Sequence, residues 1–326
     1  MATFFDISGA SKIIHVAKYV SLGNDENFEK AGEELKAFEN LPDSEQLANQ
    51  FLSPPISLSE EDTFNWFFLM DLINFHFYYE NGQQYTVTFK NQKFVGSMGL
   101  AAAINRWLEV NPHAVKPEIL ANITKEELQK ILVDDSGTDI PMIDERFAFI
   151  KSTYPLLIKK HQSFLEAVIS LEFSPKNILE YLQNNFPCFC DESDYNGHKI
   201  KFHKRAQLLI KDILTNCPES VTKRGFTTDF SYLTAFADYR IPQILCNFGL
   251  LLYNDELKNA IKNGFLENSK MEIEIRAFSI IACERLKEIT QLPAAQIDTI
   301  LWKMRRTIGK ELDKMHPFHK YYTTAY

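Results

Sequence analysis

The stretch EIEIRAFSIIACERL, residues 272–286, places apolar side chains three and four positions apart, which is the spacing of one face of an α-helix. Three further stretches have the same spacing: MIDERFAFIKSTYPLLI (142–158), KRAQLLIKDIL (204–214) and IDTILWKMRR (297–306). Amphipathic helices bury their apolar faces, so several of these helices must pack on one another. The sequence therefore predicts a mostly α fold.

Two further helices are marked by their first residues. In ITKEELQKIL, Thr124 is followed three positions later by Glu127, which is the pattern of a capping box. In SPKNILEYL, Ser174 is the expected cap and Pro175 takes the first helical position. Both patterns predict where a helix begins.

The β signal is confined to QQYTVTFKNQKFVGS, residues 83–97. Apolar Tyr85, Val87 and Phe89 alternate with polar neighbours, and the apolar pattern resumes at Phe94 after a polar turn. This pattern predicts one small β-hairpin. No repeat, low-complexity tract or linker divides the chain, so we expect a single domain over its whole length, residues 1–326.

Charge and composition narrow the possible partners. The chain has 326 residues, a net charge of -8 and a pI near 5.6, which argues against direct binding to a nucleic-acid backbone. Its first residues lack the basic and apolar regions of a secretory signal, and no run approaches the roughly 18 apolar residues of a membrane span. We expect a cytoplasmic protein with a small-molecule or protein partner and no membrane partner. The oligomeric state stays open.

The common catalytic signatures are missing from the sequence. There is no phosphate-binding glycine loop, no dinucleotide GxGxxG, no HExxH and no GxSxG. The five cysteines lack metal-site spacing and are expected to be buried or free thiols: Cys188, Cys190, Cys217, Cys246 and Cys283. We therefore expect chemistry by carboxylates, histidines and aromatic residues, with no cofactor and no metal.

Two clusters each permit a structural and a functional interpretation. FNWFFLMDLINFHFYY, residues 64–79, combines eight aromatic residues with several polar ones, which suits either a core or a pocket that stacks a flat ring. KFHKRAQLLIKDI, residues 201–213, begins with a short basic run, which suits either a solvated helix end or an anion site.

A third cluster, TTDFSYLTAFADYRIPQIL, residues 227–245, holds two carboxylates among residues that otherwise resemble a core. An unpaired carboxylate in apolar surroundings is costly, so Asp229 and Asp238 each need a partner or a role. Arg240 lies two positions after Asp238 and is a candidate ion-pair partner.

Five blocks of the chain resemble the queuosine salvage protein family, the queuosine 5′-phosphate N-glycosylase/hydrolases. The blocks are FNWFFLMDLINFHF, FHKRAQLL, FADYRIPQIL, EIEIRAFSI and PFHKYY. The resemblance runs from about residue 60 to the end and covers residues 1–60 weakly. It implies a helical domain related to the helix-hairpin-helix DNA glycosylases, with a small β element. It also implies hydrolysis of queuosine 5′-phosphate to queuine and ribose 5-phosphate, so that queuine can be salvaged into tRNA.

The resemblance implies a division of labour between the two carboxylates. The family's catalytic aspartate lies nine positions before the aspartate of the FADYR block, which indicates Asp229 as catalytic and leaves Asp238 as a structural carboxylate. A carboxylate near the ribose C1′ stabilises the positive charge that develops on the sugar or activates the attacking water.

Substrate contacts follow from the same resemblance. Queuine is a 7-deazaguanine without N7, so its departure needs hydrogen bonds to the pyrimidine edge and stacking on its face. Candidates for binding the base are Asn65, Trp66, Asp71, Asn74 and Phe75. Candidates for binding the 5′-phosphate are His319, Lys320, Lys204, Arg205 and Arg240, with His319 and Lys320 favoured. Two alternatives remain, a non-catalytic protein that binds a modified nucleotide and a helical scaffold.

Overall fold

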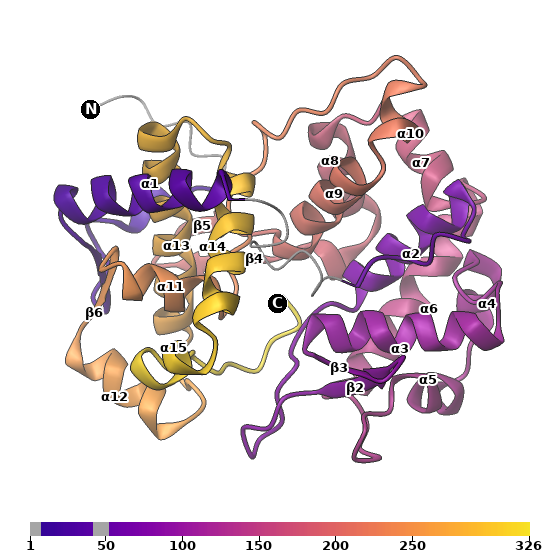
Figure 1. Cartoon of the computed structure of the whole chain (residues 1–326), viewed down its shortest axis with the longest axis horizontal. Coiled ribbons are helices and arrows are strands. Elements are labelled where there is room, and N and C mark those ends of the chain that lie inside the picture. Colours follow the sequence, from indigo (N-terminus) through magenta and orange to yellow (C-terminus); the bar gives the residue numbers. More distant parts are fainter. Residues whose placement is uncertain (1–7, 42–51) are drawn as a thin grey trace.

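The computed structural model describes residues 8–41 and 52–326 (Figure 1). Helices dominate these residues, and the strands form short antiparallel pairs. The prediction of a mostly α fold is confirmed, whereas the relation to helix-hairpin-helix DNA glycosylases stays a prediction. No helix of the described residues is long and apolar enough to cross a membrane.

The helices pack around two hydrophobic cores, which define two lobes. The α2 lobe, on the right of Figure 1, is built mainly from residues 52–191 and 204–236. Its elements are α2 (Glu60–Leu72), β2 (Thr86–Phe89), β3 (Gln92–Val95), α3 (Ser97–Val110), α4 (Pro117–Asn122), α5 (Lys125–Leu132), α6 (Ile143–Lys160), α7 (Phe164–Ser170), α8 (Pro175–Asn185), η3 (Pro187–Phe189), α9 (Lys204–Asn216) and α10 (Pro218–Thr222).

The second lobe, here the α13 lobe, surrounds a long central helix that is buried along most of its length. Its elements are η1 (Ala10–Ile13), β1 (Val20–Leu22), α1 (Asp25–Glu39), β4 (Glu192–Tyr195), β5 (His198–Lys201), α11 (Ile241–Asn247), β6 (Leu251–Tyr253), α12 (Asp255–Asn263), α13 (Ser269–Thr290), α14 (Ala294–Ile308) and α15 (Lys310–Met315). The α13 lobe therefore combines the beginning, the middle and the end of the chain.

The helix starts that the sequence predicts are present in the structure, whereas the prediction of the strands was incomplete. The capping box of Thr124 and Glu127 forms as predicted, and the Ser174 side chain caps α8. The predicted hairpin is β2 paired with β3. The expectation that the β signal is confined to that hairpin was wrong, because β4 pairs with β5 and β1 pairs with β6. The turn between β4 and β5 is Asn196-Gly197, both at positive φ, which is a strong hairpin signal.

The chain crosses from the α13 lobe to the α2 lobe in its final segment, residues 316–326. The phenol of Tyr78, in the α2 lobe, hydrogen-bonds the main chain of Tyr321, and the N–H of His76 donates to the carbonyl of Tyr326. This segment lies between the two halves in Figure 1. It therefore helps to hold the lobes against each other.

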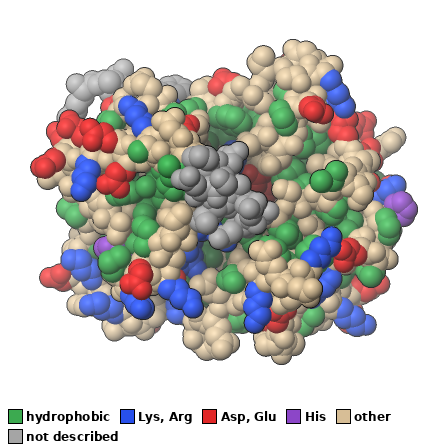
Figure 2. Space-filling model, in the orientation of Figure 1, with side chains coloured by type: hydrophobic (Ala, Val, Ile, Leu, Met, Phe, Trp, Pro, Cys, Tyr) green, Lys and Arg blue, Asp and Glu red, His purple; other side chains and the backbone are tan. Residues whose placement is uncertain are grey.

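Charged side chains of both signs are spread over the surface. Basic and acidic residues are interspersed on both halves of the face in Figure 2, with no continuous basic surface among the described residues drawn there. This distribution agrees with the net charge of -8.

Candidate active site

Polar side chains gather where the two lobes meet, and we call this region the seam. Its centre is the segment of residues 234–240, which is held from both sides. From the α2 lobe, the Gln207 side chain accepts the N–H of Thr234 at 2.8 Å and donates to its hydroxyl at 3.1 Å. From the α13 lobe, Asp298 accepts the N–H of Phe236 at 2.9 Å. The segment is thereby fixed in a non-helical conformation ahead of α11.

Asp238 is half-buried at the end of this segment. Its Oδ1 accepts the backbone N–H of Arg240 at 2.6 Å and that of Ile241 at 2.9 Å, at the start of α11. Both of these bonds go to Oδ1, and none of the hydrogen bonds found within the described residues goes to Oδ2. One oxygen therefore fixes the carboxylate in place.

Asp298 is the second carboxylate of the seam, and its environment differs from that of Asp238. The side chain is buried, with 5% exposed. Burial and the nearby charge of Asp238 raise the pKa of Asp298 to about 7. Asp298 can therefore hold a proton near neutral pH, which is what a general acid requires.

Two lysines of α9 bring positive charge to this region. Lys204 is buried, and its charge acts to lower the pKa of both Asp298 and Asp71. Lys211 lies five residues before the end of α9, and its Nζ is 3.6 Å from Oδ1 of Asp212. The seam thus combines carboxylates and amines from helices of both lobes.

Asp71 reaches the seam from the end of α2. Its Oδ1 accepts the Asn74 side-chain amide at 2.9 Å, whereas its buried Oδ2 has no partner among the described residues. Burial and the charge of Asp212 raise the pKa of Asp71 well above its usual value. Of the residues expected to bind the base, Asp71 and Asn74 are the two whose polar atoms lie at this end of α2.

The other candidates for binding the base belong to the core of the α2 lobe. Trp66 is buried and donates its indole N–H to Asn105 at 2.8 Å. Asn65 is buried and accepts the N–H of Phe164 at 3.0 Å. Phe75 is fully buried, with the guanidinium of Arg146 4.3 Å from its ring centre. The structural interpretation of the aromatic cluster is therefore favoured for these three residues.

Asp229, expected to be catalytic, lies on an exposed turn. Its two oxygens accept the N–H and the hydroxyl of Ser231 at 2.8 and 2.9 Å, and these bonds lower the pKa of Asp229. Both oxygens are thus used locally at the surface. This geometry argues against Asp229 as the catalytic carboxylate.

The expected ion pair between Asp238 and Arg240 does not form. The guanidinium of Arg240 instead donates to Asp313 at 3.0 Å and lies 4.3 Å from the ring centre of Phe318. From Arg240, Asp238 accepts the backbone N–H and no side-chain hydrogen bond. The role expected for Arg240 as a phosphate ligand is also weakened, because its side chain is buried and already paired.

The remaining phosphate candidates differ in the charge that they can offer. His319 is buried, and burial together with the charge of Arg276 lowers its pKa to about 3, so the ring is neutral at pH 7. The assignment of His319 to the 5′-phosphate stays a prediction, and this low pKa does not favour it. Arg205 donates to the carbonyls of Leu72 and Cys188. Lys320 is half-buried beside Phe265. Lys204 remains a candidate, and its charge acts on two carboxylates of the seam, Asp71 and Asp298.

Sequence reasoning missed several residues of the seam, and the clearest is Asp298. It interrupts the apolar face of α14 in the stretch IDTILW. The argument applied to Asp238, that a carboxylate among core residues needs a partner or a role, would have selected it too. Lys211 and Asp212 carry no comparable signal, because charged residues are common on helices.

Comparisons with known proteins indicate one family. A family model described as queuosine salvage protein matches residues 55–326. A relative from Nematostella vectensis is 35% identical over 71% of this chain and 67% of its own length. A relative from Mus musculus is 31% identical over 80% and 81%, and one from Schizosaccharomyces pombe is 28% identical over 91% and 92%. Each of the three is named queuosine 5′-phosphate N-glycosylase/hydrolase.

Proposed function

Because this chain belongs to the queuosine salvage protein family, we propose that it hydrolyses the N-glycosidic bond of queuosine 5′-phosphate. The products are queuine and ribose 5-phosphate, and queuine then becomes available for salvage into tRNA. The names of the relatives support the reaction and the substrate. The observation within the structure that supports it best is Asp238, a carboxylate that two backbone N–H groups hold through one oxygen.

Asp238 is the group that we assign to the sugar. Breaking the bond between C1′ and the base nitrogen develops positive charge on the ribose, and a fixed carboxylate stabilises that charge without reorganising. The same carboxylate can accept a proton from the water that adds to C1′. The two N–H groups at the start of α11 hold Asp238 for this role. It thus takes the place that the sequence suggested for Asp229.

Asp298 is the group that we assign to the departing base. Queuine carries carbon at the position of N7, so the base must be stabilised through its other edge. A protonated carboxyl group donates a hydrogen bond, and the raised pKa of Asp298, about 7, keeps a proton available near neutral pH. The two aspartates would then act in different protonation states, as in other sites that cleave glycosidic bonds.

Lys204 is the group that we assign to the 5′-phosphate. Its ammonium has no hydrogen bond or ion pair within the described part of the chain, although it lies close enough to Asp298 to affect that residue's pKa. A phosphate held there, remote from C1′, would position the ribose against Asp238. We further propose that the enzyme acts on the free nucleotide in the cytoplasm and does not bind nucleic acid directly.

Incubation of the purified protein with queuosine 5′-phosphate, followed by chromatography, tests the proposal. Release of queuine and ribose 5-phosphate is the expected result. A thermal shift with the nucleotide but no product would make the protein a binder of modified nucleotides. Neither shift nor product would leave a helical scaffold.

A further inference from the structure

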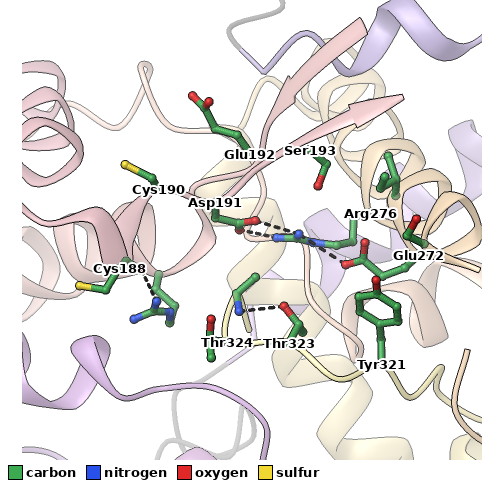
Figure 3. A pocket seen from close by; sticks show the side chains of 14 residues that line it. Cys188, Cys190, Asp191, Glu192, Ser193, Glu272, Arg276, Tyr321, Thr323 and Thr324 are labelled. Atoms are coloured by element: carbon green, nitrogen blue, oxygen red, sulfur yellow. Dashed lines mark hydrogen bonds and ion pairs between the residues drawn. The ribbon is translucent and has the colours of Figure 1, made fainter. Parts of the chain in front are cut away.

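Arg276 of α13 connects two parts of the seam. Its side chain is buried, with 1% exposed. Its Nε donates to the carbonyl of Ala237 at 3.0 Å, and its two terminal nitrogens donate to the two oxygens of Asp191, one of them at 3.0 Å. Figure 3 shows this paired arrangement at the centre of the view. The Nη1 of Arg276 also lies 3.5 Å from Oε1 of Glu272, so one guanidinium contacts a main-chain carbonyl and two carboxylates at once.

The Asp191 end of this connection fixes the start of α9. Oδ2 of Asp191 also accepts the backbone N–H of Lys204 at 3.2 Å. Its carbonyl accepts the N–H groups of Phe202 at 2.9 Å and His203 at 3.0 Å. The position of the first residue of α9, Lys204, is thus set by Asp191, which is set in turn by Arg276.

The bond from Arg276 to Ala237 fixes the peptide group that precedes Asp238. The carbonyl of Ala237 belongs to the peptide group that leads directly into Asp238, so the bond from Arg276 orients the peptide that carries this aspartate. The guanidinium plane is itself confined between aromatic rings, 3.9 Å from the ring centre of Phe202 and 4.7 Å from that of Tyr326. It has little freedom to rotate.

A buried ion pair alone is weak evidence for a stabilising role, because desolvation offsets much of the attraction. The arrangement around Arg276 has a different property. It requires three donors in one plane, two directed in parallel at Asp191 and one directed at Ala237, which guanidinium supplies and an ammonium group does not. The geometry therefore favours a role in alignment over one in packing.

We propose that Arg276 is a positioning residue that sets Asp238 and Lys204 at the correct separation for glycosidic cleavage. This inference rests on the proposed function, because it assigns Asp238 to the sugar and Lys204 to the phosphate. Displacing a positioned group by about 1 Å lowers turnover by up to about 10²-fold. The loss should fall mainly on kcat, since other residues bind the base and the phosphate contact of Lys204 acts by positioning the ribose for the reaction.

The cavity in Figure 3 allows a direct test. It measures about 240 Å³ and is lined by Arg276, by Asp191 and by the exposed residues Cys190 and Glu192. A small cation can therefore enter the space that Arg276→Ala creates. We expect this variant to lose at least ~10-fold in kcat, and guanidinium chloride at non-denaturing, millimolar concentrations to restore a measurable part of it. Methylammonium and sodium chloride serve as ions without the planar fork.

Two further variants separate alignment from stability. Arg276→Lys keeps the charge but cannot reach Ala237 and both oxygens of Asp191, so its kcat should fall at least ~10-fold with KM nearly unchanged, and guanidinium should not rescue it. Arg285→Ala is the matched control on the same helix, since Arg285 pairs with Asp25 and stacks on Phe28 away from the seam. Its kcat should match that of the wild type.

The outcomes are distinct. Rescue of kcat by guanidinium alone supports the inference. A wild-type kcat in Arg276→Lys, or guanidinium that raises the melting temperature of Arg276→Ala without raising kcat, assigns Arg276 to stability and overturns it. A wild-type protein that releases no queuine defeats the proposed function, and this inference falls with it.

Discussion

The hydroxyl of Tyr78 donates to the carbonyl of Tyr321 at 2.9 Å and accepts the N–H of the same residue at 3.0 Å. Tyr78 follows α2 in one lobe, and Tyr321 belongs to the segment that arrives from the other. One buried phenol therefore satisfies two main-chain groups across the seam. Unpaired buried groups are costly, so this contact should stabilise the closed arrangement of the lobes.

Replacing that phenol tests the contact. Tyr78→Phe leaves the partly buried N–H and carbonyl of Tyr321 without their partner, so the free energy of unfolding should fall by about 1–3 kcal/mol. Urea denaturation measures this change. The matched control is Tyr322→Phe, which loses only a bond to Glu80 at the exposed surface and should change stability by less than about 0.5 kcal/mol. Equal losses in the two variants would contradict the account.

Phe75 distinguishes a core residue from a base-stacking one. It is fully buried between the guanidinium groups of Arg146 and Arg205. Phe75→Ala should therefore lower the free energy of unfolding by about 3–5 kcal/mol, as expected for a cavity in a core. The KM of the remaining folded enzyme should stay within about twofold of wild type. A stable variant with a greatly raised KM would restore Phe75 to the base site.

Lys204 decides whether phosphate binding contributes to rate. Lys204→Met keeps the apolar part of the side chain and removes the charge. Cleavage of queuosine 5′-phosphate should fall at least ~10-fold in kcat/KM, while cleavage of plain queuosine should change less than about twofold. His319→Ala is the comparison, because a buried neutral ring should not distinguish the two substrates. Selective loss of nucleotide cleavage in His319→Ala would instead return phosphate binding to the final segment.

The protonation of Asp298 sets the expected pH dependence of kcat/KM. Burial and the charge of Asp238 raise its pKa to about 7, so the proton assigned to the departing base is lost as the pH rises through that value. The kcat/KM of the wild type should fall on the alkaline side of about pH 7. Asn keeps a donor at this position, so Asp298→Asn should retain activity and lose the alkaline fall. An unchanged pH profile in Asp298→Asn would assign the titration to another group.

The same shift predicts a change in stability. The pKa of Asp298 is higher in the folded state than the ordinary value of 3.8, so folding favours its protonated form. Its contribution is greatest below pH 3.8 and is lost as the pH rises to about 7. Comparing the melting temperatures of wild type and Asp298→Asn across this range isolates the contribution. The difference between them should grow in favour of Asn as the pH rises.

Sequence reasoning succeeded where a structure depends on neighbouring residues. The capping box of Thr124 and Glu127 is set within four positions, and the hairpin of β2 and β3 within ten. The pairing of Val20 with Tyr253 joins distant parts of the chain, and no local pattern encodes it. Strand pairing of that kind depends on how α1 and α13 pack.

The residues of the seam, too, were predictable only where neighbouring residues determine their setting. The unusual setting of Asp238 is visible in its own stretch of sequence, but its companion Asp298 contacts the segment from 62 positions away. Asp229 presents the contrasting case. It lies in the same stretch and has the right chemistry, yet a local turn with Ser231 holds it at the surface. Burial and long-range partners, which separate the two aspartates, are properties of the packed chain.

The central claim, that Asp238 performs the glycosidic cleavage, is tested most directly by turnover in two matched variants. Asn accepts the N–H groups of Arg240 and Ile241 as Asp does, so Asp238→Asn should remain folded with a near-normal melting temperature. Release of queuine from queuosine 5′-phosphate should fall at least ~10²-fold in this variant and stay near wild type in Asp229→Asn. Near-normal turnover in Asp238→Asn, together with an inactive and folded Asp229→Asn, would contradict the account and return the catalytic role to Asp229.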